Sequence, residues 1–227
     1  MEYNLLRDII QWDIYNWSQA INFWENKLPV YDSPLHCLEL GSRNGGLSLW
    51  LASKGNRVLC SDLTSPTDNA VRMHNKYILD GTITYEAIDA TNIPYKSAFD
   101  LVVFKSVLGG ISKNGNDTLK SIVIHQILSA LKPGGHLLFA ENLEASGIHK
   151  FFRKRFTRWG QYWNYLRLDE VEKLLGLFRK YDILTLGFFG AFGQNELQRN
   201  ILGRLDRLVG KWIPDKQKYI LVCIAQK

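Results

Sequence analysis

Short apolar runs alternate with amphipathic stretches along this chain, and their spacing predicts strands that alternate with helices. The clearest run is Phe99–Phe104, FDLVVF, where consecutive Leu and Val are typical of a parallel strand covered on both faces. Similar runs predict seven strands, at residues 37–40, 57–60, 83–87, 99–104, 136–141, 181–189 and 219–225. Helices are expected at residues 2–26 (one or two), 47–52, 66–80, 117–131, 168–180 and 195–211. This alternation predicts an α/β fold built on one mostly parallel sheet.

The composition is that of an ordinary globular chain. With 227 residues, of which 46% are hydrophobic and 22% charged, the sequence suits one domain with a large core. No apolar run approaches the roughly 18 residues of a membrane span, and the charged start MEYNLLRDIIQWD does not resemble a secretory signal. Cys37, Cys60 and Cys223 fall in expected strands and are interpreted as buried thiols, and no Cys/His spacing suggests a metal site. A cytoplasmic location is therefore expected.

Positive charge is concentrated in one segment, residues 144–168. The net charge of +6 favours acidic partners or anionic surfaces, and no acidic residue lies between Ala145 and Leu168. The cations there are Lys150, Arg153, Lys154, Arg155, Arg158 and Arg167, and the aromatics are Phe151, Phe152, Phe156, Trp159, Tyr162, Trp163 and Tyr165. This segment is either a solvated basic helix with inward aromatics or a substrate cap. A cap of this kind suits phosphate, carboxylate or uronate groups, sugar faces, nucleic acid or an anionic membrane surface.

Residues 36–52, HCLELGSRNGGLSLWLA, predict a strand, a glycine turn and a helix. Glycine allows a sharp bend and the close approach of a ligand, and the free N–H groups of a helix start point at that ligand. The arrangement is therefore typical of a site for a nucleotide-like molecule. A dinucleotide fingerprint needs glycines at Gly41, at position 43 and at Gly46, but position 43 is arginine. The turn does not match a dinucleotide site.

The pattern Glu39-x-Gly41-x-Arg43-x-Gly45 instead resembles motif I of the class I S-adenosylmethionine-dependent methyltransferases, acid-x-Gly-x-Gly-x-Gly. Arg43 replaces the middle glycine, and its side chain is expected either to neutralise the methionine carboxylate or to point outward. The segment LKPGG at Leu131–Gly135 resembles the turn before the family's fifth strand. The resemblance implies S-adenosylmethionine as cofactor and S-adenosylhomocysteine as product.

The same resemblance implies the architecture of the whole chain. We expect a single Rossmann-like domain over residues 1–227, with a seven-stranded, mostly parallel sheet, an antiparallel last strand and helices on both faces. Residues 1–34 are expected either to pack on the sheet edge or to form an N-terminal helical lid over cofactor and substrate, as in the family. The segment 144–168 follows the fifth strand, where the family varies most, and is the expected substrate cap.

In the family, acids at the ends of later strands bind the adenosine. Asp62 lies where the family places its ribose-binding carboxylate, although a lone Asp there would also cap the next helix. Asp89-Ala90 resembles the acidic-small pair beside the adenine, although Asp is also common in plain turns. The cofactor-binding residues implied by the resemblance are Glu39, Gly41, Ser42, Arg43, Gly45, Asp62, Leu63, Asp89, Ala90 and Lys105.

The acceptor side of the site is less well defined by the sequence. Many relatives carry a His after the fourth strand, but Gly109 and Gly110 stand here, so no base is carried over from that position. His149, at the start of the cap, is the candidate general base. Candidate acceptor contacts are Asn142, Arg153, Trp159 and Tyr162.

These features predict methyl transfer by in-line displacement to an O or N atom of a small-molecule or glycan-like, anionic acceptor. A nucleic-acid methyltransferase is the alternative, opposed by the lack of a separate RNA-binding domain and by residues 105–108, KSVL, in place of a base-flipping tetrapeptide. A non-catalytic cofactor-binding or scaffold protein also stays open, because Arg43 and the missing His would fit it. Peripheral contact with an anionic membrane surface is a further expectation.

Overall fold

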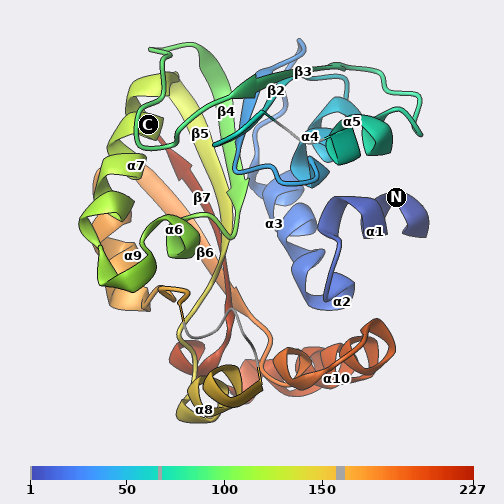
Figure 1. Ribbon diagram of the computed structural model, residues 1–227, viewed down its shortest axis with the longest axis vertical. Coiled ribbons are helices and arrows are strands. Elements are labelled where there is room, and N and C mark those ends of the chain that lie inside the picture. The colour runs from blue at the N-terminus through green and yellow to red at the C-terminus, as the bar shows by residue number, and fades with distance from the viewer. Residues whose placement is uncertain (1, 66–67, 157–161) are drawn as a thin grey trace.

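A single seven-stranded sheet forms the centre of the computed structural model, which describes residues 2–65, 68–156 and 162–227 (Figure 1). The strands are β1 (His36–Leu40), β2 (Arg57–Asp62), β3 (Thr82–Ala87), β4 (Phe99–Lys105), β5 (Leu131–Asn142), β6 (Lys180–Leu186) and β7 (Ile220–Gln226). Their order across the sheet is β3-β2-β1-β4-β5-β7-β6. Strands β1 to β5 pair in parallel, whereas β7 runs antiparallel to both β5 and β6. The predicted sheet, including its antiparallel last strand, is confirmed.

Helices lie on both faces of the sheet. They are α1 (Tyr3–Ile10), α2 (Ile14–Trp17), α3 (Gln19–Lys27), α4 (Gly46–Ala52), α5 (Asp68–His74), α6 (Leu108–Ile111), α7 (Thr118–Ala130), α8 (Gly147–Phe156), α9 (Leu168–Leu175) and α10 (Glu196–Val209). Short 3-10 turns are η1 (Lys113–Gly115), η3 (Gly190–Phe192), η4 (Gly210–Trp212) and η5 (Asp215–Gln217). Helices α7 and α9 cover one face, and α3, α4 and α5 cover the other (Figure 1).

The two cores explain why the strands are continuously apolar. Along β4, Val102 and Phe104 pack into the core under α7 and α9, while Leu101 and Val103 pack into the core under α3 and α4. Both side-chain sets of the strand are therefore buried, as expected for a parallel strand covered on both faces. The three cysteines are buried free thiols.

The N-terminal segment forms three short helices instead of the expected one or two. Gln11 and Asp13 adopt positive φ values of 73° and 44°, which break the helix between α1 and α2. The large rings of Trp17 and Trp24 are nevertheless fully buried. The aromatic residues thus anchor a bent segment instead of a straight helix.

Two other expectations change in detail. Helix α5 ends at His74 instead of residue 80, because the chain turns there and the N–H of Tyr77 donates to the His74 carbonyl at 3.0 Å. In the basic segment α8 is helical over Gly147–Phe156, and the described residues 162–167 return beside the end of β5 through a bridge between Leu143 and Leu166. The predicted contact Trp159 lies outside the described residues. Among the residues that the structure describes, no helix is both long and apolar enough to cross a bilayer.

Candidate functional site

Five strand ends meet at one edge of the sheet. Parallel strands place all their carboxyl ends at the same edge, where open α/β sheets bind ligands. The turn after β1, Asp62 at the end of β2, Asp89 beyond β3, Lys105 at the end of β4 and Asn142 at the end of β5 all come to this edge. The fold therefore brings the predicted cofactor residues at these strand ends and Asn142 to one edge, from distant parts of the sequence.

Glu39 orders the start of α4. Its carboxylate accepts hydrogen bonds from the N–H groups of Leu47 and Ser48 at 3.2 and 2.7 Å, and from the Ser48 hydroxyl at 2.5 Å. An acid is favourable beside the first turn of a helix, where N–H groups lack helical partners. Burial raises the pKa of Glu39 to about 7, opposed by these donors and by the ammonium of Lys105. Glu39 thus fixes the start of α4, and through it the position of the glycine turn that leads into this helix.

The turn between β1 and α4 requires glycine at two positions. Gly41 and Gly45 have φ values of 60° and 72°, in the left-handed region that favours glycine. A Cβ on Gly41 would lie 2.6 Å from Cγ2 of Val107, and a Cβ on Gly45 would lie 2.5 Å from the ring of His74. The side chains of Val107 and His74 therefore pack directly against the backbone of the turn. Neither position tolerates a side chain without movement.

His74 supports the turn from behind. Its Nε2 lies 2.8 Å from the Gly45 carbonyl oxygen and its Nδ1 lies 2.7 Å from the Tyr85 hydroxyl. A carbonyl oxygen only accepts, so Nε2 carries the proton and the hydroxyl of Tyr85 donates to Nδ1. Burial lowers the pKa of His74, which keeps the ring neutral. The sequence offered no sign of this support.

Arg43 takes the position of the family's middle glycine with a left-handed backbone, at φ 52°. Its N–H donates to Oδ2 of Asp62 at 2.8 Å, and the N–H of Leu63 donates to Oδ1 at 2.8 Å. A carboxylate has about four acceptor sites, so Asp62 is fixed by two N–H groups and keeps capacity for two further donors. The Arg43 side chain is exposed, and so is the apolar side chain of Leu63 beside the acid.

Asp89 forms a tight turn beyond β3. Its Oδ1 accepts from the N–H and hydroxyl of Thr91 at 2.8 and 2.7 Å, as in an Asx turn. The N–H of Ile88 donates to the Asp62 carbonyl at 2.8 Å, which ties the ends of β2 and β3 together. Ala90 is buried next to them. The adenine contact of Asp89 and Ala90 stays a prediction.

Lys105 and the turn contact the N-terminal segment. The Lys105 ammonium donates to the carbonyl of Ile10 at 2.6 Å and lies 5.3 Å from the ring centroid of Trp17. Burial lowers its pKa to about 8. On the turn, the Asn44 amide donates to the side-chain oxygen of Gln11 at 2.9 Å. The segment between α1 and α2 therefore lies directly over two of the strand ends.

The end of β5 fixes the connection that follows β4. Oε1 of buried Glu141 accepts from the N–H groups of Val107 and Leu108 at 2.5 and 2.7 Å. Burial raises the pKa of Glu141 to about 7. The Asn142 amide donates to the hydroxyl of Ser106 at 2.9 Å. Asn142 is thus held at the same edge as Lys105, on the side where an acceptor is expected.

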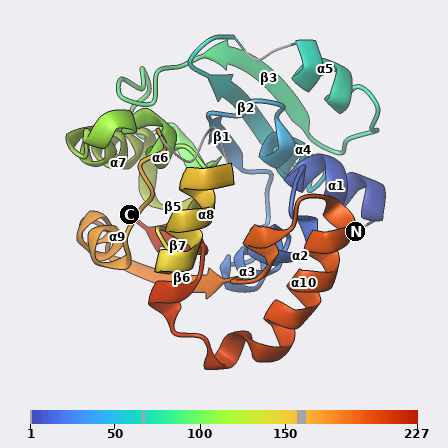
Figure 2. The same cartoon turned by 60° about the horizontal axis from the view of Figure 1, so that its bottom comes forward.

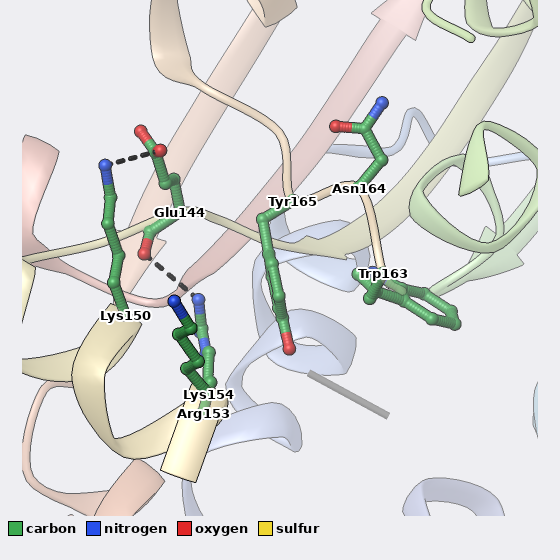
Figure 3. Close-up of a pocket in the computed structure, with 7 residues that line it drawn as sticks. All are labelled: Glu144, Lys150, Arg153, Lys154, Trp163, Asn164 and Tyr165. Carbon is green, nitrogen blue, oxygen red and sulfur yellow. Dashed lines mark hydrogen bonds and ion pairs between the residues drawn. The ribbon is translucent and has the colours of Figure 1, made fainter. Parts of the chain in front are cut away.

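The basic segment lines an open pocket of about 520 Å³, called here the cap pocket (Figure 3). Its lining residues are Glu144, Lys150, Arg153, Lys154, Trp163, Asn164 and Tyr165. The Arg153 guanidinium donates to the carbonyls of Leu143 and Glu144 at 2.8 and 3.0 Å and lies 3.9 Å from the ring centroid of Tyr165. Lys150 pairs with Glu144 at 2.5 Å. Tyr162 is exposed beyond the pocket lining.

Trp163 fills the space left by the two glycines after β4. A Cβ on Gly109 would lie 2.1 Å from the indole nitrogen, and one on Gly110 would lie 3.1 Å from the same ring. The N–H of Asn164 donates to the Gly109 carbonyl at 3.1 Å. The glycine pair was the only sequence signal of this close approach. It marks where the cap contacts the end of β4.

The structure does not favour His149 as a general base. The side chain is only 1% exposed, with Nε2 2.8 Å from the Phe188 carbonyl and Nδ1 2.7 Å from the Ser146 hydroxyl. The ring packs against Phe188, Phe192 and Tyr219. Because protein groups bond both nitrogens, the geometry favours a packing role, and burial lowers the pKa of His149.

A buried polar network, not suggested by the sequence, joins the N-terminal helices to the last third of the chain. Asp206 of α10 accepts from the Asn16 amide and from the N–H groups of residues 188–190. The Tyr219 hydroxyl accepts from the Asn16 amide at 2.9 Å and donates to Asp13. Burial raises the pKa of Asp13 to about 7. The network holds α2 against α10 and the start of β7.

These strand ends suit a ligand with vicinal hydroxyls and a flat aromatic ring. Asp62 is fixed by two N–H groups and retains acceptor capacity, while exposed Leu63 presents apolar surface next to it. Val107 and His74 pack closely against the glycines of the neighbouring turn. The residues present therefore fit an adenosyl group, which carries both features.

Comparison with known proteins gives a family for this part of the chain. The family described as "Methyltransferase domain" matches residues 38–139, the stretch that contains all ten predicted cofactor-binding residues. No curated protein matches the chain.

Several solved structures share the fold. Phosphoethanolamine N-methyltransferase 2 from Haemonchus contortus, in complex with phosphomonomethylethanolamine and S-adenosylhomocysteine, is 18% identical with a TM-score of 0.61. That match covers 93% of this chain and 52% of that enzyme, so the chain spans about half the length of this relative. A methyltransferase from Methanosarcina mazei is 18% identical, with a TM-score of 0.59 and coverage of 90% and 96%. One from Mesorhizobium loti is 16% identical, with a TM-score of 0.59 and coverage of 91% and 96%.

At these identities the structures establish the fold, and the family match indicates a methyltransferase domain over residues 38–139. The match spans the glycine turn and the ends of β1 to β4, where Asp62 and the other predicted cofactor residues lie. Both the strand order and the antiparallel β7 agree with the resemblance noted in the sequence. Residues 38–139 match the methyltransferase-domain family, and the chain has the fold of solved S-adenosylmethionine-dependent methyltransferases.

Proposed function

We propose that the chain transfers a methyl group from S-adenosylmethionine to an O or N atom of a small-molecule or glycan-like, anionic acceptor. The observation that carries the proposal is the hydrogen bond between the glycine turn and Asp62, in which the N–H of Arg43 donates to the carboxylate at 2.8 Å. The Asp62 carboxylate keeps acceptor sites for two ribose hydroxyls. We propose a cytoplasmic location, supported by three cysteines that are buried free thiols.

The chain's own residues position the reactants. The cofactor, when bound, supplies a methyl group on a sulfonium, which is already activated for in-line displacement. Asp62 would hold the ribose and Leu63 would pack on the adenine, while the turn at Gly41 and Gly45 would border the methionine part. The N-terminal segment, held by Lys105, would cover the site and exclude water. Alignment and a dry pocket are the main requirements of this reaction.

No described residue is assigned as a general base. His149 is fully used by protein partners, and Gly109 and Gly110 stand where many relatives carry a His. A base is needed only for a poorly acidic hydroxyl or a protonated amine. We therefore favour an acceptor that arrives deprotonated or loses its proton to water.

The cap pocket supports an anionic acceptor. Three cations, Lys150, Arg153 and Lys154, and one carboxylate, Glu144, line the pocket. The lining therefore carries an excess of positive charge, and guanidinium and ammonium groups recognise phosphate and carboxylate. The Haemonchus contortus relative binds phosphomonomethylethanolamine, a small acceptor with a phosphate group. Asn142, Arg153, Trp159 and Tyr162 remain the proposed acceptor contacts.

A panel of phosphate-bearing, carboxylate-bearing and neutral small acceptors, assayed by release of S-adenosylhomocysteine, tests this proposal. Lys150→Glu is expected to raise KM for the anionic acceptors about tenfold or more, because an ionic hydrogen bond is lost and a repulsive charge is added. Its matched control, Lys76→Glu, makes the same charge change at an exposed lysine outside the pocket. Equal effects of the two variants, or turnover of neutral acceptors only, would contradict the proposed acceptor class.

A non-catalytic cofactor-binding protein is the second candidate, because Trp163 occupies the space above Gly109 and Gly110. Cofactor binding without turnover of any acceptor in the panel would favour it. A nucleic-acid methyltransferase is the third candidate and would show RNA or DNA binding that weakens steeply with salt.

A further inference from the structure

Helix α10 lies on the protein surface with its apolar side chains facing outward. Its two buried residues carry no large apolar side chain: Asp206 is 5% exposed and bonds to the N-terminal helices, and Gly203 packs against the ring of Tyr15. Surface helices normally bury their apolar stripe and expose the polar one. This helix therefore turns its apolar stripe away from the protein core.

The outward stripe runs along the whole helix and into η4. Its members are Leu197, Ile201, Leu205, Leu208 and Trp212, with exposed fractions of 71%, 60%, 38%, 69% and 70%. At 3.6 residues per turn the four members within α10 fall within an arc of roughly 80°, and Trp212 follows in η4. Single exposed apolar residues are normal, but a contiguous stripe of this kind marks an interaction surface.

Cations flank the stripe on one side. Arg204, Arg207 and Lys211 are exposed. Within α10, Arg204 and Arg207 lie roughly 20° and 80° from the edge formed by Leu197, and Lys211 follows in η4. The only carboxylates of α10 within these described residues are Glu196 and Asp206, and both point into the protein, where they accept hydrogen bonds from the N-terminal segment. The exposed surface of α10 is thus apolar and positively charged.

Helix α8 adds a second surface of the same kind at the same end of the molecule. Ile148, Phe151 and Phe152 are exposed at 56%, 65% and 41%, and the helix contains no acidic residue. Both views place α8 and α10 at this end, which comes forward in Figure 2. Phe152 contacts Phe192 of η3 at 5.0 Å between ring centroids, which links α8 to the turn that precedes α10.

We propose that α8 and α10 dock this end of the molecule on an anionic phospholipid surface, with the apolar stripe of α10 in the interfacial region. An interfacial helix carries an apolar face beside Lys and Arg, and each cation near an anionic surface adds about fivefold in affinity. A second copy of this chain would bring two positively charged faces together. Charge complementarity therefore favours lipid over self-association.

Docking has a consequence for the site. Lys150, Arg153 and Lys154 of α8 line the cap pocket (Figure 3), so binding of α8 at the surface brings the pocket to the level of the lipid headgroups. An acceptor attached to a lipid would reach the pocket without leaving the interface. Vesicle binding itself does not depend on methyl transfer, so it is measured separately from activity.

Vesicle flotation tests the proposal. The full chain is mixed with phosphatidylcholine vesicles that contain about 30% phosphatidylglycerol, and with vesicles of phosphatidylcholine alone. Binding is expected only to the anionic vesicles and weakens in high salt. Ile201→Glu with Leu208→Glu is expected to abolish it, whereas Val30→Glu with Ile78→Glu, at two fully exposed apolar residues elsewhere, keeps it.

Charge is tested with a second matched pair. Arg204→Glu with Arg207→Glu and Lys76→Glu with Lys96→Glu each lower the net charge from +6 by 4, to +2. The first variant is expected to lose about 25-fold or more in vesicle affinity and the second far less. Trp212→Phe should retain binding but lose the quenching of tryptophan fluorescence by brominated lipid.

Three results would overturn the proposal. One is failure of the unmodified chain to bind the anionic vesicles. Another is an equal loss of vesicle binding in the variants of α10 and in the control variants elsewhere on the surface. The third is a dimer in light scattering that Ile201→Glu dissociates while no vesicles are bound, which would assign the stripe to contact between copies.

Discussion

Replacement of Gly45 by alanine tests the geometry of the cofactor turn most sharply, because the chain offers a matched control. Gly45 and Gly55 flank α4 and both have positive φ, 72° and 83°. A Cβ on Gly45 would lie 2.5 Å from the His74 ring, whereas a Cβ on Gly55 would meet nothing within 4 Å. The two substitutions therefore share the backbone strain and differ in the clash.

The magnitudes follow from these two terms. A left-handed alanine costs about 1–2 kcal/mol at either position, and overpacking adds about 1–3 kcal/mol at Gly45 alone. We predict that Gly45→Ala lowers the free energy of unfolding by about 2–5 kcal/mol, and that Gly55→Ala lowers it by about 1–2 kcal/mol. Because Gly45 belongs to the cofactor turn, only Gly45→Ala should weaken the binding of S-adenosylhomocysteine.

Urea unfolding and titration calorimetry measure both effects. A double variant, Gly45→Ala with His74→Ala, removes the clash, so its loss of stability should be smaller than the sum of the single losses by about 1–3 kcal/mol. Equal destabilisation by Gly45→Ala and Gly55→Ala, or strict additivity with His74→Ala, would refute the packing of His74 on the turn.

Three further predictions concern single residues. Arg43→Gly should unfold with a free energy about 1 kcal/mol higher than Arg43→Ala, since both lack the side chain and only glycine relieves φ 52°; equal urea midpoints would contradict the left-handed turn. Burial raises the pKa of Asp13 from 3.8 to about 7, so the native state binds the proton more tightly and stability falls as pH rises through that window. Relative to Asp13→Asn, the unmodified chain should lose about 1.4 kcal/mol for each pH unit there, and a difference in urea unfolding that does not vary with pH would argue against it. His149→Ala should cost about 2–4 kcal/mol of stability through its buried contacts and leave S-adenosylhomocysteine affinity unchanged; loss of affinity without loss of stability would speak against a packing role.

The fold was predictable because its signals are local. The apolar run of β4 and the glycine turn after β1 depend on a few neighbouring residues, and the family motif extends these signals to the order of the strands. Helix ends were less predictable: the turn at Tyr77 that ends α5 had no strong sequence signal. The bends at Gln11 and Asp13 could not be predicted from the sequence, since both residues have positive φ and neither is a glycine.

The site was predictable only where the family motif reaches. The sequence predicted that Asp62 lies beside the glycine turn, because the two follow β2 and β1, which are adjacent in the sheet. His149 looked available from its neighbours in sequence, but its surroundings come from Phe188 and Phe192, about forty residues later. The reversed orientation of α10 also could not be read from its own sequence, because it depends on the partners of Asp206 in the N-terminal helices.

Titration calorimetry of S-adenosylhomocysteine tests the central claim, that the turn and Asp62 together hold an adenosyl group. The unmodified chain should bind one molecule per chain, Asp62→Ala should show no measurable binding, and Asp80→Ala, at an exposed acid outside the site, should bind normally. An absence of binding to the unmodified chain, or full affinity in Asp62→Ala, would contradict the account.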